Sequence, residues 1–383
     1  APSPAADHEA PNALPVGTSL GEFEITAFVG EGGFGIVYEA YDHSLQRRVA
    51  LKEYLPHGCG GRVAGTSDVT PAAGREGDIF AWGRERFLRE AEMLSRLRHP
   101  SIVRVFDTFE ANGTAYMALD YVKGGTLGAW LRKLGRIPAQ SELDRLVGPL
   151  VDALSHVHSL FLLHRDIKPD NIMLTAEGTP VLIDFGAAKA AIAGHSRAAG
   201  IDQAISTSLV VVSDGYSPPE QYAPEERLQG PWTDVYAFAA TLYRAISGSA
   251  PPPATSRQVA ESYRPLSAMS FPHGLGNTTA NSAGEGTGEP WRRSFLESID
   301  RALSLRREDR PQSAAELQRL LSQEAPRRPS GQGARLERPS LPVSEAEPGV
   351  LPQAAFGEMH SPGRITGSRA VTTLDAAPRP RTF

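Results

Sequence analysis

The chain has 383 residues, of which 40% are hydrophobic and 22% are charged, and its formal net charge is -5. The slight excess of acidic residues argues against a nucleic-acid-binding protein that depends on a basic surface, and the composition is typical of a soluble globular chain. The single cysteine, Cys59, excludes an internal disulfide or a cysteine-based zinc cluster and favours a reducing compartment. No apolar run approaches the roughly 18 residues of a membrane span.

The first part of the chain is predicted to be rich in strands. Residues 1–17 contain many Pro and Ala residues without periodicity, which predicts a flexible arm, so order is expected to begin near Thr18. Alternating apolar residues with β-branched and aromatic side chains predict strands. They cover a hairpin within 23–49 and the segments 48–54, 102–109 and 114–122. The Gly-rich segment 57–78 predicts a loop, and the apolar spacing over 84–98 predicts a helix.

The second part is predicted to be mainly helical. Helices are expected at 143–158, 231–247, 291–305 and 314–321. Strands followed by helices predict an α+β arrangement in two lobes, an N-terminal lobe of about 18–121 and a C-terminal lobe of about 122–322. The Gly, Ser, Asn and Thr residues of 267–290 indicate a surface insertion, and the proline-containing, lysine-free residues 323–383 predict a disordered tail.

A glycine cluster lies between the first two strand-like runs. It reads Gly30-Glu31-Gly32-Gly33-Phe34-Gly35-Ile36-Val37 and fits G-x-G-x-x-G-x-V. Glycines let backbone amides approach phosphate groups closely, with Phe34 at the tip of the loop. Taken alone, the cluster is equally typical of a tight hairpin, and a dinucleotide-binding fold would need a helix directly after it.

Lys52 ends the apolar strand that begins at Val49. A lysine at such a position is most often simply solvated. Close to a glycine loop it can hold the α- and β-phosphates of a nucleotide, provided that a carboxylate fixes it. Glu90 on the predicted helix is the expected partner, and Glu85 and Glu92 are its competitors.

One segment decides the chemistry. It reads His164-Arg165-Asp166-Ile167-Lys168-Pro169-Asp170-Asn171 and is followed by Asp184-Phe185-Gly186. Phosphoryl transfer needs a carboxylate near the attacking hydroxyl, cations at the phosphate oxygens and oxygen ligands for magnesium. Asp166 supplies the carboxylate, and Lys168 and Lys52 supply the cations. Asn171 and Asp184 supply the metal ligands.

Together these motifs resemble the protein kinase family over about residues 18–322, and Lys168 is its serine/threonine signature. The segment 215–222 is similar to the bacterial branch of the eukaryotic-like serine/threonine kinases. The resemblance implies a two-lobed kinase fold, with one regulatory helix in the β-rich N-lobe and a mainly α-helical C-lobe. It also implies ATP with Mg²⁺, or Mn²⁺ as an alternative, and protein substrates with Ser or Thr acceptors.

The resemblance assigns further residues around the nucleotide. Those expected at adenine are Val37, Ala50 and Met173 against the ring, Leu119 at the back of the pocket, and the backbone of Asp120 and Val122 as the hinge. Each of them also fits a plain core strand. Two structural features are implied as well, a buried ion pair between Glu220 and Arg310 and a buried helix aspartate at Asp234.

Regulation is expected at Arg165, because an arginine beside the base needs an anion, which a phosphate on the following loop would provide. Thr207 is the first choice for that phosphate, with Ser206 and Ser208 beside it. Activity without loop phosphorylation is the alternative. Autophosphorylation between copies would require a transient homodimer.

This chain has Val212-Ser213 where the family usually has a Gly-Thr pair. Ser213 is expected to hydrogen-bond Asp166 and Lys168, but the departure also favours an alternative, a pseudokinase that acts as a nucleotide-gated scaffold. A third hypothesis treats the tail as a phosphorylated adaptor for phosphopeptide-binding partners, with acceptors such as Thr372 and Thr373.

Three expectations concern context. The segment 57–79 is either a regulatory insert or, more simply, a tolerated surface loop, and Cys59 within it is expected to be an exposed, inert thiol rather than a redox sensor. The expected location is cytoplasmic, either for the whole protein or for the cytosolic part of a longer membrane-anchored one. No nucleic-acid partner is expected.

Overall fold

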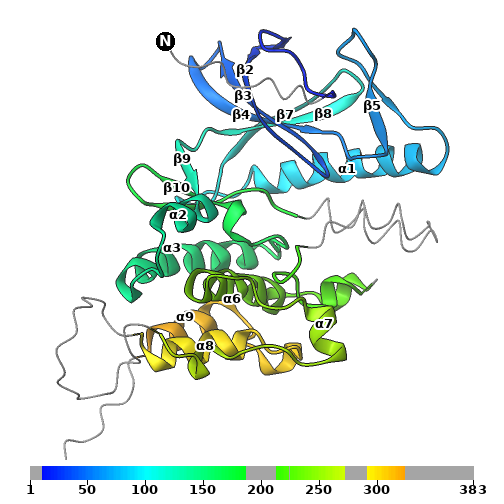
Figure 1. Cartoon of the computed structure of the whole chain (residues 1–383). Coiled ribbons are helices and arrows are strands. Elements are labelled where there is room, and N and C mark those ends of the chain that lie inside the picture. The colour runs from blue at the N-terminus through cyan, green and yellow to red at the C-terminus, as the bar shows by residue number, and fades with distance from the viewer. Residues whose placement is uncertain (1–10, 187–212, 224, 272–290, 324–383) are drawn as a thin grey trace, which may run out of the picture. The chain divides into compact units, whose positions relative to one another are not determined.

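The computed structural model describes residues 11–186, 213–223, 225–271 and 291–323 (Figure 1). The strands are β1 (Ser19–Leu20), β2 (Phe23–Gly32), β3 (Gly35–Asp42), β4 (Arg47–Tyr54), β5 (Gly60–Arg62), β6 (Val69–Pro71), β7 (Val105–Ala111), β8 (Thr114–Asp120), β9 (Gly124–Thr126), β10 (Ile172–Thr175) and β11 (Pro180–Leu182). The helices are α1 (Arg75–Leu94), α2 (Leu127–Leu134), α3 (Gln140–Ser159), α6 (Pro231–Ser247), α7 (Ala254–Val259), α8 (Arg293–Ala302) and α9 (Ala314–Ser322). The predicted strand-rich lobe followed by a helical lobe is confirmed.

The N-terminal lobe is an antiparallel sheet in the order β1-β2-β3-β4-β8-β7, with α1 lying across it (Figure 1). In β4 the side chains alternate, so that Val49 and Leu51 are fully buried while Ala50 and Lys52 share the other, partly open face. β4 therefore directs Lys52 away from the packed layer that Val49 and Leu51 enter.

The C-terminal lobe is organised around α6. Pro231 starts this helix at a position where a missing amide hydrogen has no cost, and Gly248, with a φ of 85°, ends it. Most of its side chains are buried, because α8 and α9 pack against it and α9 also packs against α3. A small sheet, β11-β10-β9, lies near the junction of the lobes, where Ile102 forms a parallel bridge to Leu182.

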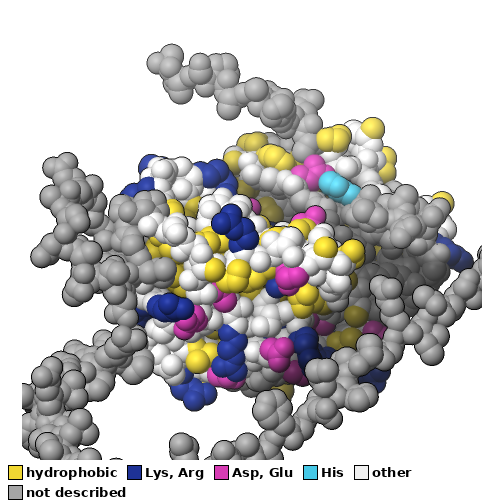
Figure 2. Space-filling view, turned by 60° about the horizontal axis from the view of Figure 1, so that its bottom comes forward, with side chains coloured by type: hydrophobic (Ala, Val, Ile, Leu, Met, Phe, Trp, Pro, Cys, Tyr) yellow, Lys and Arg dark blue, Asp and Glu magenta, His cyan; other side chains and the backbone are white. Residues whose placement is uncertain are grey.

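Charged side chains of both signs are interspersed on the face shown in Figure 2. This pattern agrees with the small net charge of -5. Among the helices of the described residues, none is long and apolar enough to cross a membrane.

The prediction of a loop over 57–78 was wrong. The segment contains the β5–β6 hairpin, and α1 begins at Arg75, nine residues before the predicted start at Arg84. The apolar face of α1 continues upstream through Ile79 and Phe80, which are buried, but Gly77 and Gly83 conceal the helical spacing in the sequence.

The predicted flexible arm of 1–17 is too long. Leu14 is buried, and its backbone amide donates to the hydroxyl of Tyr38 at 3.0 Å. Asn12 accepts a hydrogen bond at its side-chain oxygen from the backbone amide of Arg62, also at 3.0 Å. Order therefore begins before Thr18, since these residues pack on the sheet and on the hairpin.

Cys59 was predicted to be exposed, and that prediction was also wrong. The side chain is fully buried, and burial raises the pKa of its thiol to about 11. The thiol is therefore protonated at neutral pH and poorly nucleophilic, in line with the expected inertness but for a different reason.

The predicted insertion at 267–290 is described only at its start. Leu266 is buried beside it, and the backbone amide of Ser267 donates to Asp300 of α8 at 2.9 Å. The remainder, from 272 to 290, lies outside the described residues, as do the tail residues 324–383 and with them Thr372 and Thr373.

Candidate functional site

The loop that carries Asp166 runs from the end of α3 to β10, and a side chain of α6 anchors its backbone. Asp234 of α6 accepts hydrogen bonds from the backbone amides of His164 (2.9 Å) and Arg165 (2.8 Å), and it contacts His158 Nε2 at 2.8 Å. Burial alone would raise the pKa of the Asp234 carboxyl, but these hydrogen bonds and the nearby imidazoles hold it below its ordinary value. Asp234 is therefore an anion that fixes the backbone of the loop.

His164 connects this loop to the segment of Asp184. Its ring is buried and stacks on Phe185 with 4.4 Å between the ring centroids. Burial lowers the pKa of His164, so the ring is neutral at pH 7. The Nε2–H group then donates to the carbonyl of Ile183 at 3.1 Å. Arg165 and Asp184 both have positive φ, 66° and 58°, and such strained backbone is typical of functional sites.

Asp166 is buried and lies in a polar constellation. The amide group of Asn171 donates to the backbone carbonyl and to Oδ2 of Asp166, both at 2.8 Å. Ser213 donates to Oδ1 of Asp166 at 2.8 Å and accepts from Lys168 Nζ at 2.9 Å, and the Lys168–Asp166 distance is 3.3 Å. The hydrogen bonds expected of Ser213 are thus confirmed.

Lys52 pairs with Asp184 and not with Glu90. The predicted Lys52–Glu90 pair is absent from the ion pairs of the described residues, although Glu90 is buried on α1. The sequence placed Glu90 on the correct helix, but the separation between α1 and β4 depends on tertiary packing that helical spacing does not contain. Lys52 and Asp184 lie next to each other. A site that binds a phosphate together with a metal ion needs a cation and a carboxylate placed in this way.

Glu90 lines a cavity of about 660 Å³ between α1 and the loop of Asp166. The cavity also contains Arg86 and Arg89 from α1 and Arg165 from the loop. Within the described part of the chain, Nε of Arg165 is buried without a hydrogen-bond partner. Arginines outnumber carboxylates among these groups, so the cavity suits an anion. Thr207, Ser206 and Ser208, predicted to carry that anion, lie outside the described residues.

The glycine-rich loop joins β2 to β3, between two strands as the sequence predicted. Gly35 must be glycine, because a Cβ atom there would lie 1.9 Å from the carbonyl oxygen of Glu53. Phe34 lies in the turn between β2 and β3, at the tip of the loop as expected, and its side chain is buried. Gly30, Glu31 and Gly32 belong to β2, and Gly33 lies in the turn that follows.

The residues expected against the adenine ring and at the back of its pocket lie on strands of two sheets. Ala50 of β4 is in register with Leu119 of β8, and Val37 of β3 is in register with Lys52. Met173 lies on β10, opposite Thr126. These positions bring Val37, Ala50 and Leu119 to the same sheet as Lys52.

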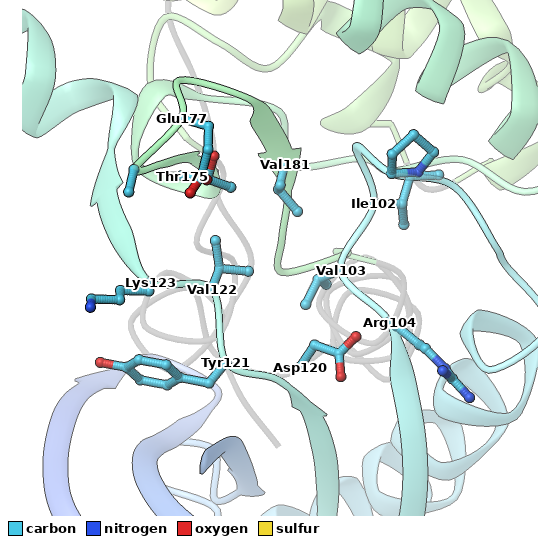
Figure 3. Close-up of a pocket in the computed structure, with 12 residues that line it drawn as sticks. Ile102, Val103, Arg104, Asp120, Tyr121, Val122, Lys123, Thr175, Glu177 and Val181 are labelled. Carbon is cyan, nitrogen blue, oxygen red and sulfur yellow. The ribbon is translucent and has the colours of Figure 1, made fainter. Parts of the chain in front are cut away.

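Asp120 and Val122, the predicted hinge residues, also border a second cavity, next to the end of β8. Asp120 and Val122 line this space of about 310 Å³ together with Ile102 and Val181 (Figure 3). The backbone amide of Asp120 donates to the carbonyl of Arg104 at 2.9 Å. The amide of Asp120 is therefore already used, and only its carbonyl oxygen is available to accept a hydrogen bond from adenine.

The predicted structural pair is present. Arg310 is fully buried and contacts Glu220 at 2.7 and 3.2 Å, and Glu220 also accepts from the hydroxyl of Thr233 at 3.0 Å. The sequence prediction missed Gln221, which donates to the carbonyl of Arg165 at 2.7 Å and so links the segment of Glu220 to the loop of Asp166. Only its position beside Glu220 could have suggested it.

Asn171 and Asp184 are suited to a metal ion. The amide NH₂ of Asn171 is fixed on Asp166, so its carbonyl oxygen is left for another partner, and Asp184 contributes a carboxylate. The described residues contain no group of three or more His, Cys, Asp or Glu side chains that would hold an ion without help. Such a donor set fits Mg²⁺, which usually binds one or two protein ligands together with substrate phosphates.

Comparison with known proteins agrees with this geometry. Residues 23–319 match the family model described as "Protein kinase domain". A serine/threonine-protein kinase of Mycobacterium tuberculosis, PknA, is 34% identical over 242 residues, which cover 62% of this chain and 49% of the relative. A probable serine/threonine-protein kinase of Bifidobacterium longum is 32% identical over 60% of this chain and 27% of its own length. This chain thus spans about half or less of the curated relatives that it matches.

Solved structures show the same likeness. A structure titled "PpkA-294 apo form" is 37% identical, with a TM-score of 0.67, and the match covers 81% of this chain and 99% of that one. The PknI kinase domain of M. tuberculosis is 23% identical with a TM-score of 0.53, which supports the fold alone.

Proposed function

The chain belongs to the protein kinase domain family, and on this premise we propose that it transfers the γ-phosphoryl group of ATP to Ser or Thr hydroxyls of proteins. The observation that carries the proposal is the constellation around Asp166, in which Asn171, Lys168 and Ser213 all contact one buried carboxylate. Lys52 and Asp184 lie paired nearby. The names of the relatives, all serine/threonine kinases, support the same acceptor chemistry.

Each residue has a distinct task in this proposal. Asp166 orients the acceptor hydroxyl and takes up its proton, and Asn171 keeps the carboxylate in place. Lys168 balances the charge that develops on the transferred group. A magnesium ion held by Asn171 and Asp184 would supply positive charge to the phosphate oxygens.

Lys52 has to change partners when a nucleotide binds. Its ammonium group faces Asp184 in this structure, whereas the α- and β-phosphates of ATP would compete for it. This arrangement supports a second candidate, a non-catalytic scaffold in which Lys52 remains bound to Asp184.

We also propose that the chain phosphorylates its own loop, preferably at Thr207, in transient pairs of molecules. The support is the cavity of Arg86, Arg89 and Arg165, where arginines gather beside the loop of Asp166. A phosphate bound there would neutralise Arg165 and connect it to α1. Phosphopeptide-binding partners for the tail are a separate proposal that rests only on its Ser and Thr residues.

Incubation with labelled ATP and Mg²⁺ tests the function. The parent and an Asp166→Asn variant are compared for incorporation, for transfer to a generic protein substrate and for binding of a non-hydrolysable ATP analogue. Incorporation in the parent alone, mapped by mass spectrometry to Thr207 or its neighbours, supports an autophosphorylating kinase. Equal analogue binding by both proteins without transfer by either would favour the scaffold.

A further inference from the structure

The segment that follows β4 runs along the glycine-rich loop. Two backbone hydrogen bonds continue the β3–β4 pairing past the strand ends, from Leu55 N to Phe34 O at 3.2 Å and from His57 N to Gly33 O at 3.1 Å. The imidazole of His57 also contacts Glu31 of the loop, with 2.9 Å between Nε2 and Oε1. His57 therefore touches the loop through both its backbone and its side chain.

The turn that carries His57 is held in place by the β5–β6 hairpin segment that follows it. Cys59 N donates to Pro56 O at 3.2 Å, and Gly58 has a φ of 76°, as in a β-turn with glycine at the third position. Cys59 is fully buried, and its carbonyl accepts a hydrogen bond from Ala72 N at 2.8 Å. The location of His57 thus depends on the β5–β6 hairpin as well as on β4.

Glu31 brings a negative charge into a loop whose backbone is expected to approach phosphates. A triphosphate and a carboxylate repel each other, so an unpaired Glu31 would oppose nucleotide binding. The contact between His57 Nε2 and Glu31 Oε1 ties this carboxylate to the turn that carries His57, and so it holds the loop in place. Glycine-rich loops are intrinsically adaptable, which makes such an external contact effective.

We propose that His57 is a positioning residue for nucleotide binding. Acting through Glu31, it holds the glycine-rich loop over the phosphates. This gives residues 57–74, which precede α1 and contain the β5–β6 hairpin, a role in the use of ATP. The inference rests on the proposed kinase function, because it requires that the loop bind a nucleotide.

The test is a comparison of His57→Ala, Glu31→Gln and the double variant. The KM for ATP, kcat and the Kd of a non-hydrolysable ATP analogue with Mg²⁺ are measured for each. His57→Ala is expected to raise KM and Kd about two- to fivefold, the range of a partly exposed ion pair, with kcat unchanged within about twofold. His57→Lys should retain most of the affinity, because its ammonium group can still contact Glu31.

A matched control is available on the same sheet. His43 contacts Glu24 at 2.8 Å in a similarly exposed pair at the start of β2, and His43→Ala should leave KM and Kd unchanged. Three results would overturn the inference: unchanged KM and Kd in His57→Ala, an equal change in His43→Ala, or the same effect of His57→Ala on the Glu31→Gln background. A parent chain that binds the analogue but transfers no phosphate would refute only the proposed catalysis, while a parent without any nucleotide affinity would refute both.

Discussion

Replacing Ser213 by alanine tests how the site of Asp166 is organised. The hydroxyl lies 2.8 Å from Asp166 Oδ1 and 2.9 Å from Lys168 Nζ, so the variant loses two hydrogen bonds to charged groups. Each is worth about 1.5–3 kcal/mol, but the direct Lys168–Asp166 contact at 3.3 Å persists and preserves part of the interaction. We expect a net loss of about 1.5–3 kcal/mol of transition-state stabilisation, which corresponds to roughly 10- to 150-fold in kcat.

Steady-state kinetics with a protein substrate measures this loss. Because Ser213 contacts the groups near the acceptor and not Lys52, the KM for ATP should stay within about twofold of the parent value. Ser213→Thr, which keeps the hydroxyl, should restore most of the rate. Ser95→Ala, which removes an exposed hydroxyl bonded only to the carbonyl of Glu92, is the control. Wild-type kcat in Ser213→Ala, or equal losses in the alanine and threonine variants, would refute the reasoning.

Three further predictions concern stability and reactivity. Arg310→Ala leaves Glu220 buried without its partner and should lower the free energy of unfolding by about 3–5 kcal/mol in urea denaturation, whereas Arg306→Ala, whose side chain is 79% exposed, should change it by less than about 0.5 kcal/mol. Burial lowers the pKa of His164 from 6.5, so below that pH the unfolded chain binds a proton that the folded chain does not. The free energy of unfolding should then fall by up to about 1.4 kcal/mol per pH unit until the folded-state pKa is reached, and His164→Asn should reduce this slope between pH 7 and 5. Cys59 should resist iodoacetamide at neutral pH in the folded chain and react after unfolding, and fast labelling of native protein would contradict its burial.

The contacts around Asp166 could be predicted from sequence because its partners on the same loop occur at short, fixed spacings. Asp166, Lys168 and Asn171 lie within six consecutive residues, and their mutual contacts follow from one local loop. The partner of Lys52 could not be predicted, since Glu90 and Asp184 lie on separate elements whose distances depend on how α1 packs. Here the carboxylate beside Lys52 is that of Asp184.

The fold was predicted correctly where periodicity was clear, as in α6, and incorrectly where glycines interrupted it. Gly77 and Gly83 concealed the first turns of α1, although Ile79 and Phe80 bury the same face as the later residues. The burial of Cys59 was missed for a related reason, because a hairpin formed by segments as short as β5 and β6 leaves almost no alternation in the sequence.

A buried polar cluster shows that the insertion is part of the N-terminal lobe. Glu53 is fully buried and accepts hydrogen bonds from Tyr38 (2.6 Å), Tyr116 (2.7 Å) and Arg62 (2.6 Å). Burial and the charge of Glu53 raise the pKa of both phenols, so they remain donors at neutral pH. Arg62 comes from β5, and it also donates to the carbonyl of Asn12 at 2.8 Å, which joins the N-terminal segment to the hairpin.

This cluster predicts a large cost for Arg62→Ala. The Arg62 and Glu53 side chains are 5% and 0% exposed, and removal of one partner from such a pair costs about 3–5 kcal/mol because the remaining charge stays buried. Arg48→Ala, which removes a 67%-exposed side chain paired with Glu39, should cost less than about 1 kcal/mol. Urea denaturation of the two variants compares them directly. If Arg62→Ala were as stable as Arg48→Ala, residues 57–74 would be a loosely attached surface loop. Such a loop could not hold His57 against the glycine-rich loop either.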